Sequence, residues 1–126
     1  MAIIVCMNAI LTGRQLEKAA QDLEAVGRRL IAARIAAGLT PTELAKRAGL
    51  TTSTLANWES GANRPRVDQL GRVLPILRVT SDFVFYGLDH HLSWDVREAI
   101  AAAFEKLPEH RRSRFAAKPA PLRKSV

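Results

Sequence analysis

The chain has 126 residues and a formal net charge of +7 at pH 7, which gives a sequence pI near 10.5. This length fits one domain with a short extension, and an apolar share of 48% is enough for one core. The basic surplus favours a polyanionic partner. Cys6 is the only cysteine, so an intrachain disulfide is excluded and a reducing cytoplasm is the expected location.

The N-terminus begins with an apolar run over residues 2–7. The run is too short to cross a bilayer and lacks the basic start of a signal peptide, so no membrane association is expected. Three interpretations stay open. The run is a frayed terminus, an edge strand, or sequence that precedes a true initiator at Met7.

Residues 15–37 have a helical pattern that predicts one long helix or two helices joined near Gly27. Within it Leu16, Leu23 and Leu30 recur every seven residues. This stripe either pairs with a second subunit or packs on the bundle of its own chain, and the pattern does not choose between the two.

A short helix is predicted after Thr40, because Thr40 is a good N-cap, Pro41 suits the first helical position and Glu43 completes a capping box. Its apolar residues share one face, and they are Leu44, Ala45 and Ala48. Gly49 then stops the helix, since a sharp exit often needs a positive φ that glycine adopts without penalty.

A second short helix over 51–60 is predicted directly after this corner, with Thr51 as its cap. Leu55 and Trp58 are three residues apart and face inward. The residues left facing outward are Thr52, Ser53, Ala56 and Asn57. Two helices around a glycine corner form either a helix-turn-helix that contacts the DNA major groove or an ordinary αα-hairpin, and the short polar row favours the former.

Three further helices are predicted towards the C-terminus. The first covers 67–77, with a kink or an early end at Pro75, and the second covers 82–86 and ends at Gly87. The third covers 94–107 after a Ser93 cap; its expected buried residues are Trp94, Ile100, Ala101, Phe104 and Leu107.

The remaining residues predict little ordered structure. Residues 110–117 are expected to add a final turn, and 118–126 to form a disordered basic tail. His90, His91 and His110 lack cysteine partners and the helical spacing of metal ligands, so they are expected to be loop residues. Neither a metal nor a cofactor is expected.

The residues around the two central helices resemble a known family. They include the run Arg-Ile-Ala-Ala-Gly-Leu at 34–39, the pair Trp58 and Glu59, the loop Asn-Arg-Pro at 63–65 and the run 80–87. Residues 26–88 thereby resemble the lambda-repressor/Cro-type (XRE) helix-turn-helix domain. The resemblance implies an all-α fold, in which a five-helix DNA-binding bundle follows a partly helical N-terminal extension (1–25) and precedes a C-terminal helix with a basic tail (89–126).

The resemblance also implies a set of DNA contacts. The expected base contacts are Thr52, Ser53, Ala56 and Asn57, and the expected backbone contacts are Thr40, Thr42, Asn63, Arg64 and Arg66. Many family members carry a phosphate-contacting Gln at the start of the second helix, where this chain has Pro41. The resemblance further implies that Arg34 faces Glu59 as a structural pair that fixes the orientation of two helices.

These features predict a regulator of transcription that binds double-stranded DNA in the cytoplasm, and we expect a repressor that acts as a homodimer. Two alternatives share this chemistry: an antitoxin whose residues 89–126 wrap a toxin partner, and a restriction-modification controller. A helical protein-interaction module without DNA binding is the alternative from another class. No nucleophile-base constellation, metal cluster or phosphate loop stands out, so an enzyme is not expected.

Overall fold

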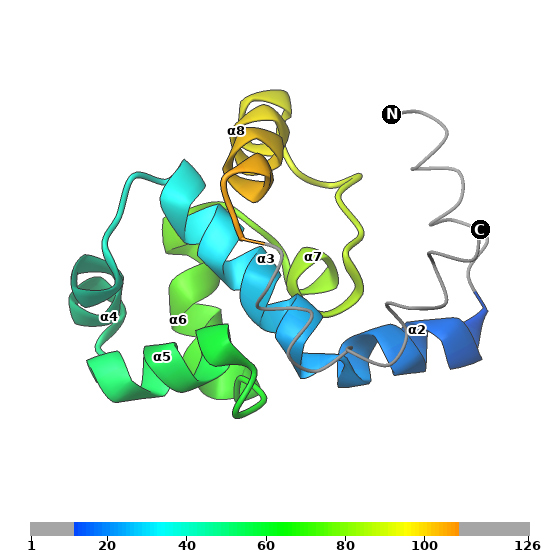
Figure 1. Ribbon diagram of the computed structural model, residues 1–126, viewed down its shortest axis with the longest axis horizontal. Helices are drawn as coiled ribbons and strands as arrows, with labels where there is room; N and C mark the ends of the chain where they lie inside the picture. Colours follow the sequence, from blue (N-terminus) through cyan, green and yellow to red (C-terminus); the bar gives the residue numbers. More distant parts are fainter. Residues whose placement is uncertain (1–11, 109–126) are drawn as a thin grey trace.

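The computed structural model describes residues 12–108, and within them every regular element is an α-helix, as the sequence predicts (Figure 1). The elements are α2 (Gly13–Gln21), α3 (Leu23–Ala36), α4 (Pro41–Ala48), α5 (Thr52–Ser60), α6 (Val67–Leu77), α7 (Ser81–Tyr86) and α8 (Trp94–Glu105). The expectations for residues 2–7, 110–117 and 118–126 lie outside the described residues.

The N-terminal helical pattern is divided at Asp22, so the predicted junction at Gly27 is wrong. Asp22 leaves helical geometry, with φ −82° and ψ 85°, and its carboxylate accepts a hydrogen bond from the backbone N–H of Ala25 at 3.1 Å. This N-cap starts a new helix. Gly27 lies within that helix. Its lack of a side chain allows close packing and does not make a turn.

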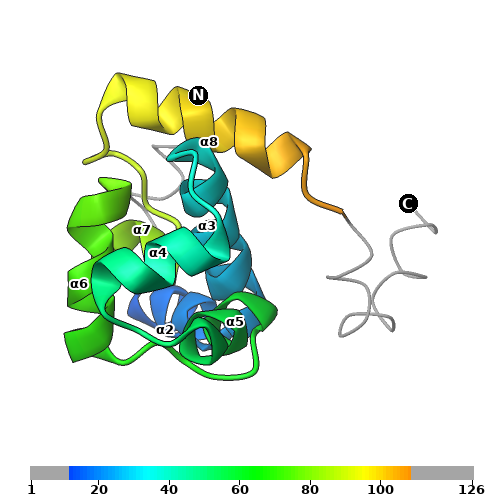
Figure 2. The same ribbon diagram turned by 90° about the vertical axis from the view of Figure 1, so that its left-hand side faces the viewer.

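Helix α3 is the centre of the bundle, and α5, α7 and α8 pack around it (Figure 2). Leu30 is only 1% exposed inside the core, whereas Leu16 and Leu23 are half-buried. The stripe therefore packs on the protein's own bundle at Leu30. The largest fully buried side chains of the core are Leu30, Leu44, Leu55, Leu70, Val26, Val73, Val84 and Pro65.

Helix α6 runs past Pro75 and ends at Leu77, so an early end at the proline is wrong. Pro75 and Gly71 are both exposed, which lets water satisfy the Gly71 carbonyl that loses its intrahelical partner. The residue that closes the helix is Arg78, which adopts a left-handed conformation with φ 61°.

Helix α7 begins one residue before the predicted segment and ends at Gly87, which has φ 75°. Arg29 of α3 fastens the end of this helix by donating a hydrogen bond from Nη1 to the Val84 carbonyl at 2.9 Å. Burial lowers the pKa of the Arg29 guanidinium, and the charge of Asp22 opposes that shift.

Helix α8 lies on α3, and three of the five residues predicted to be buried over 94–107 do pack on the core, namely Ile100, Phe104 and Leu107. Its buried residues are Val96, Ile100 and Ala103, and Phe104 and Leu107 are half-buried. Trp94 is 67% exposed and Ala101 is also exposed, so burial of these two was a wrong expectation. Hydrophobic character alone suggested both, whereas the four- and three-residue spacing of the buried residues sets the face that meets α3.

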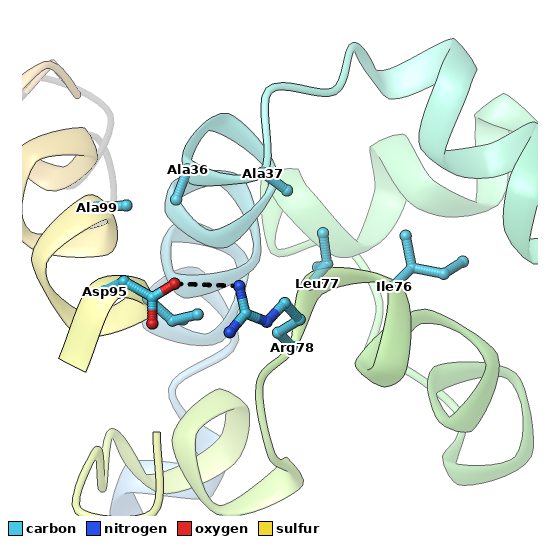
Figure 3. Close-up of a pocket in the computed structure, with 8 residues that line it drawn as sticks. Ala36, Ala37, Ile76, Leu77, Arg78, Asp95 and Ala99 are labelled. Carbon is cyan, nitrogen blue, oxygen red and sulfur yellow. Dashed lines mark hydrogen bonds and ion pairs between the residues drawn. The ribbon is translucent and has the colours of Figure 1, made fainter. Parts of the chain in front are cut away.

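Arg78 connects the end of α6 to the start of α8 (Figure 3). Its guanidinium donates to Asp95 at 3.2 Å and to the Ser93 hydroxyl at 3.3 Å, beside a cleft of about 110 Å³. The Ser93 hydroxyl donates to Asp95 at 2.7 Å and makes no capping bond, although Ser93 is the N-cap as predicted. This hydrogen bond, followed by Arg78, lowers the pKa of the Asp95 carboxyl.

Gly27→Ala tests the close packing of α3 on α5. A Cβ at Gly27 would overlap the carbonyl oxygen of Glu59 and lie 2.7 Å from that of Trp58. We expect the free energy of unfolding to fall by about 1–3 kcal/mol, measured by urea denaturation. Gly71→Ala is the matched control, because nothing lies within 4 Å of its Cβ position. It should gain about 0.5–1 kcal/mol, and equal stability of the two variants would contradict the close approach.

Candidate nucleic-acid interface

Helices α4 and α5 meet at a sharp corner whose local geometry follows the sequence. The Thr40 hydroxyl accepts a hydrogen bond from the Glu43 N–H at 3.1 Å, and the Glu43 carboxylate accepts one from the Thr40 N–H at 2.9 Å. Gly49 has φ 70°, and the Thr51 hydroxyl accepts a hydrogen bond from the Thr54 N–H at 3.1 Å. The capping box, the glycine stop and the second cap are thus confirmed.

Helix α5 has one buried side and one fully open side. Leu55 is 0% exposed and Trp58 is 2% exposed, and the helix packs on both α3 and α4. The open side carries four exposed residues, namely Thr52, Ser53, Ala56 and Asn57. All four side chains are short, so the helix backbone is able to approach a surface closely.

An ion pair joins the ends of α3 and α5. The Arg34 guanidinium donates to Glu59 from Nε to Oε2 at 2.8 Å and from Nη2 to Oε1 at 3.3 Å. Its Nη1 donates to the Leu39 carbonyl at 3.1 Å, which also holds the connection to α4. The side chains are 13% and 10% exposed, so the pair is nearly buried and Glu59 faces the bundle.

The loop after α5 is held by backbone bonds. Gly61 ends the helix with φ 85°, and the N–H groups of Ala62 and Asn63 donate to the Asn57 carbonyl at 2.9 and 3.2 Å. Pro65 is fully buried. The loop therefore has a fixed path while its polar side chains stay at the surface.

The two loop arginines are exposed, and each has a protein partner. Arg66 pairs with Asp68 at 3.2 Å, where both side chains are more than half exposed. Arg64 donates from Nη1 to the Ala20 carbonyl of α2 at 3.0 Å. This second contact reaches outside the segment that resembles the family, and no pattern in the sequence indicates it.

The structure brings one expected base-contacting residue together with three expected backbone-contacting residues. Asn57, Asn63, Arg64 and Arg66 line an open groove of about 420 Å³, whose other lining residues are Thr54, Trp58 and Gln69. Thr40 and Thr42 are exposed at the start of α4, apart from this groove. Gln69 is a polar residue of this groove that was not among the expected contacts. Its position three residues after Arg66 is the sequence pattern that could have identified it.

The comparisons assign this part of the chain to a family. Residues 30–84, which run from the middle of α3 into α7, match the model of a helix-turn-helix family. This match bears out the resemblance of these residues to the XRE-type, lambda-repressor-like helix-turn-helix domain. Such a domain supports a DNA-binding regulator of transcription. No curated protein and no solved structure matches the chain.

The matched segment leaves out α2 and α8, which flank the helix-turn-helix domain. Among residues 12–108, no helix is long and apolar enough to span a membrane.

Arg34→Ala should lower the free energy of unfolding by about 3 kcal/mol, because it leaves the nearly buried Glu59 carboxylate without its cation. Arg78→Ala is the matched control. Its ion pair with Asp95 is 59% and 69% exposed, and such surface pairs contribute about 0–1 kcal/mol. Thermal and urea unfolding measure both variants. An Arg34→Ala midpoint equal to that of Arg78→Ala would contradict an orienting role for the pair.

Proposed function

We propose that the protein is a sequence-specific transcriptional repressor that binds double-stranded DNA as a homodimer in the cytoplasm. The observation that carries the proposal is the row of four short exposed residues on α5, a helix held rigidly by α3 and α4. Its helix-turn-helix domain, flanked by residues 1–25 and 89–126, supplies the DNA-binding surface.

Base recognition is assigned to the open side of α5. The major groove is just wide enough for an α-helix, so short side chains allow the closest approach. The Asn57 amide suits a bidentate contact with the N6 and N7 atoms of adenine, and the Thr52 methyl and Ala56 suit a thymine methyl. Ser53 supplies a hydroxyl that bonds either a base edge or a phosphate.

Backbone contacts are assigned to both sides of α5. Thr40 and Thr42 lie at the start of α4, and Asn63, Arg64 and Arg66 lie in the loop beyond the other end of the helix. The Arg66–Asp68 pair does not prevent this role, because such an exposed pair contributes little and opens at low cost for a phosphate.

A homodimer follows from the size of the proposed site. One recognition helix contacts about one half-site, which gives too little discrimination against the roughly 10⁶–10⁹ competing sites of a genome. Among residues 12–108 the large hydrophobic residues classed as exposed are Val67, at 80%, and Trp94, at 67%. Phe83 is buried, and Phe85 and Tyr86 are half-buried. The aromatic residues of α7 therefore offer less exposed apolar surface to a dimer interface than Val67 and Trp94 do.

Asn57→Ala should weaken binding to the specific site by about 1–3 kcal/mol and relax the preference at one base pair, because a bidentate base contact is lost. Binding-site selection with the variant and the wild type measures both effects. Glu98→Ala, on the exposed side of α8, is the control that should change neither. An unchanged base preference would remove Asn57 from the set of base contacts.

Arg64→Ala and Arg66→Ala should weaken binding to specific and random DNA alike. Each lost phosphate contact should flatten the slope of log affinity against log salt by about one. Lys106→Ala, at the C-cap of α8, removes the same charge outside the residues assigned to DNA contact and should keep the slope. If a variant retains the wild-type slope, the arginine that it lacks makes no phosphate contact.

Sedimentation of the full chain at micromolar concentration should show a dimer, and we expect Trp94→Asp or Val67→Asp to shift it towards monomer by placing a charge in an apolar contact. Point variants are preferred to removal of residues 89–126, because Val96, Ile100 and Ala103 of α8 belong to the core. A wild type that remains monomeric on its DNA site would overturn the dimer.

A further inference from the structure

Helix α2 lies on the same side of the molecule as α5. Both views place these two helices on the side away from α8, and in Figure 1 they lie towards opposite ends of the long axis (Figures 1 and 2). Because α2 precedes the matched residues 30–84, the family assigns it no role. Its position beside the proposed DNA-binding surface raises the question of what its outer face contacts.

The outer face of α2 is basic. The helix packs on α7 and α3, and its half-buried residues Leu16, Ala19 and Ala20 form the inner face. Arg14, Lys18 and Gln21 are exposed and follow one another at spacings of four and three residues, which places them together on the opposite face. The exposed Glu17 lies at the margin of this outer face.

The C-terminal end of α2 and the start of α3 adjoin the proposed interface through two contacts. Arg64 of the loop after α5 donates its hydrogen bond to the Ala20 carbonyl near the end of α2. Gly61 of the same loop lies against the start of α3, where a Cβ would come within 3.1 Å of the Glu24 backbone. The loop that carries Arg64 and Arg66 therefore lies directly against the α2–α3 junction.

We propose that α2 is a second DNA-binding element, in which Arg14 and Lys18 bind backbone phosphates next to the half-site that α5 contacts. The proposal rests on the proposed function. The occupant follows from charge and continuity, since the same duplex that neutralises Arg64 and Arg66 extends towards α2. Flexible cationic side chains suit phosphates, and these contacts add affinity without base preference.

The test compares Arg14→Ala/Lys18→Ala with the wild type on one duplex that holds the selected site and on one random duplex. The loss of two phosphate contacts should flatten the salt slope by about two on both duplexes, while the selected base sequence stays the same. Arg14→Lys/Lys18→Arg keeps both charges and should keep the wild-type slope. Lys106→Ala and Glu17→Ala are controls for charge removed elsewhere and for removal of an acid from α2.

A shortened duplex gives the contact a location. When the base pairs next to the half-site are trimmed, the difference between the wild type and the double variant should disappear, because the phosphates assigned to α2 are absent. Thermal unfolding of the double variant, together with Arg14→Gln/Lys18→Gln, separates a lost contact from a lost fold. The variant Arg14→Lys/Lys18→Arg gives the same check on folding, because it keeps the charge of α2 unchanged.

The outcomes separate this inference from the proposed function. A wild-type slope in the double variant, with specific binding intact, overturns the role of α2 and leaves the proposed function standing. An altered base preference also overturns it, because α2 would then act on the orientation of α5. A wild type that binds no DNA overturns both.

Discussion

The rest of the structure depends on the contact between α3 and the end of α5, which is concentrated on Glu59. The backbone of Glu59 lies against Gly27, where no side chain fits, and its carboxylate is bound by Arg34. Gly27 and Arg34 are seven residues apart on α3, so both lie on one face about two turns apart. A single residue of α5 is thus held by its backbone and by its side chain, which fixes the distance and the direction of the helix together.

This constraint matters because α5 is too short to be stable alone. A helix of nine residues is marginal in water, so its shape comes from the packing of Leu55 and Trp58 and from its caps at Thr51 and Gly61. Its exposed residues add little to stability and are free for the proposed recognition of DNA. Stability and the proposed recognition are thus divided between opposite sides of one helix, and a loss of Arg34 is expected to disturb that recognition through the orientation of α5 rather than through a lost DNA contact.

Local rules predicted the elements well, and long-range packing explains where they failed. The Thr40 capping box, the positive φ of Gly49 and the inward Leu55 and Trp58 depend on neighbours within four residues, so the sequence contains them. Gly27 has the local pattern of a junction, because its partner, the Glu59 backbone, is thirty-two residues away in sequence. Hydrophobic character predicts a buried Trp94, whereas the spacing of Val96, Ile100 and Ala103 defines the face of α8 that meets α3. The hydrogen bond from Arg64 to Ala20 joins residues forty-four positions apart, which no local pattern indicates. The proposed base contacts of α5 remain predictions from resemblance.

The composition of the proposed interface links affinity to specificity. Of the four exposed residues on α5, only Asn57 has the two-headed amide that distinguishes a base pair strongly, while Thr52, Ser53 and Ala56 offer weaker contacts. Pro41 replaces the glutamine with which many members of the family steady the recognition helix on a phosphate. A half-site read by so few groups needs much of its binding energy from phosphates, which makes affinity strongly dependent on salt. Two features increase DNA affinity without enlarging α5. One is a set of cationic side chains outside the helix-turn-helix domain, and the other is a second subunit. The net charge of +7 favours the first.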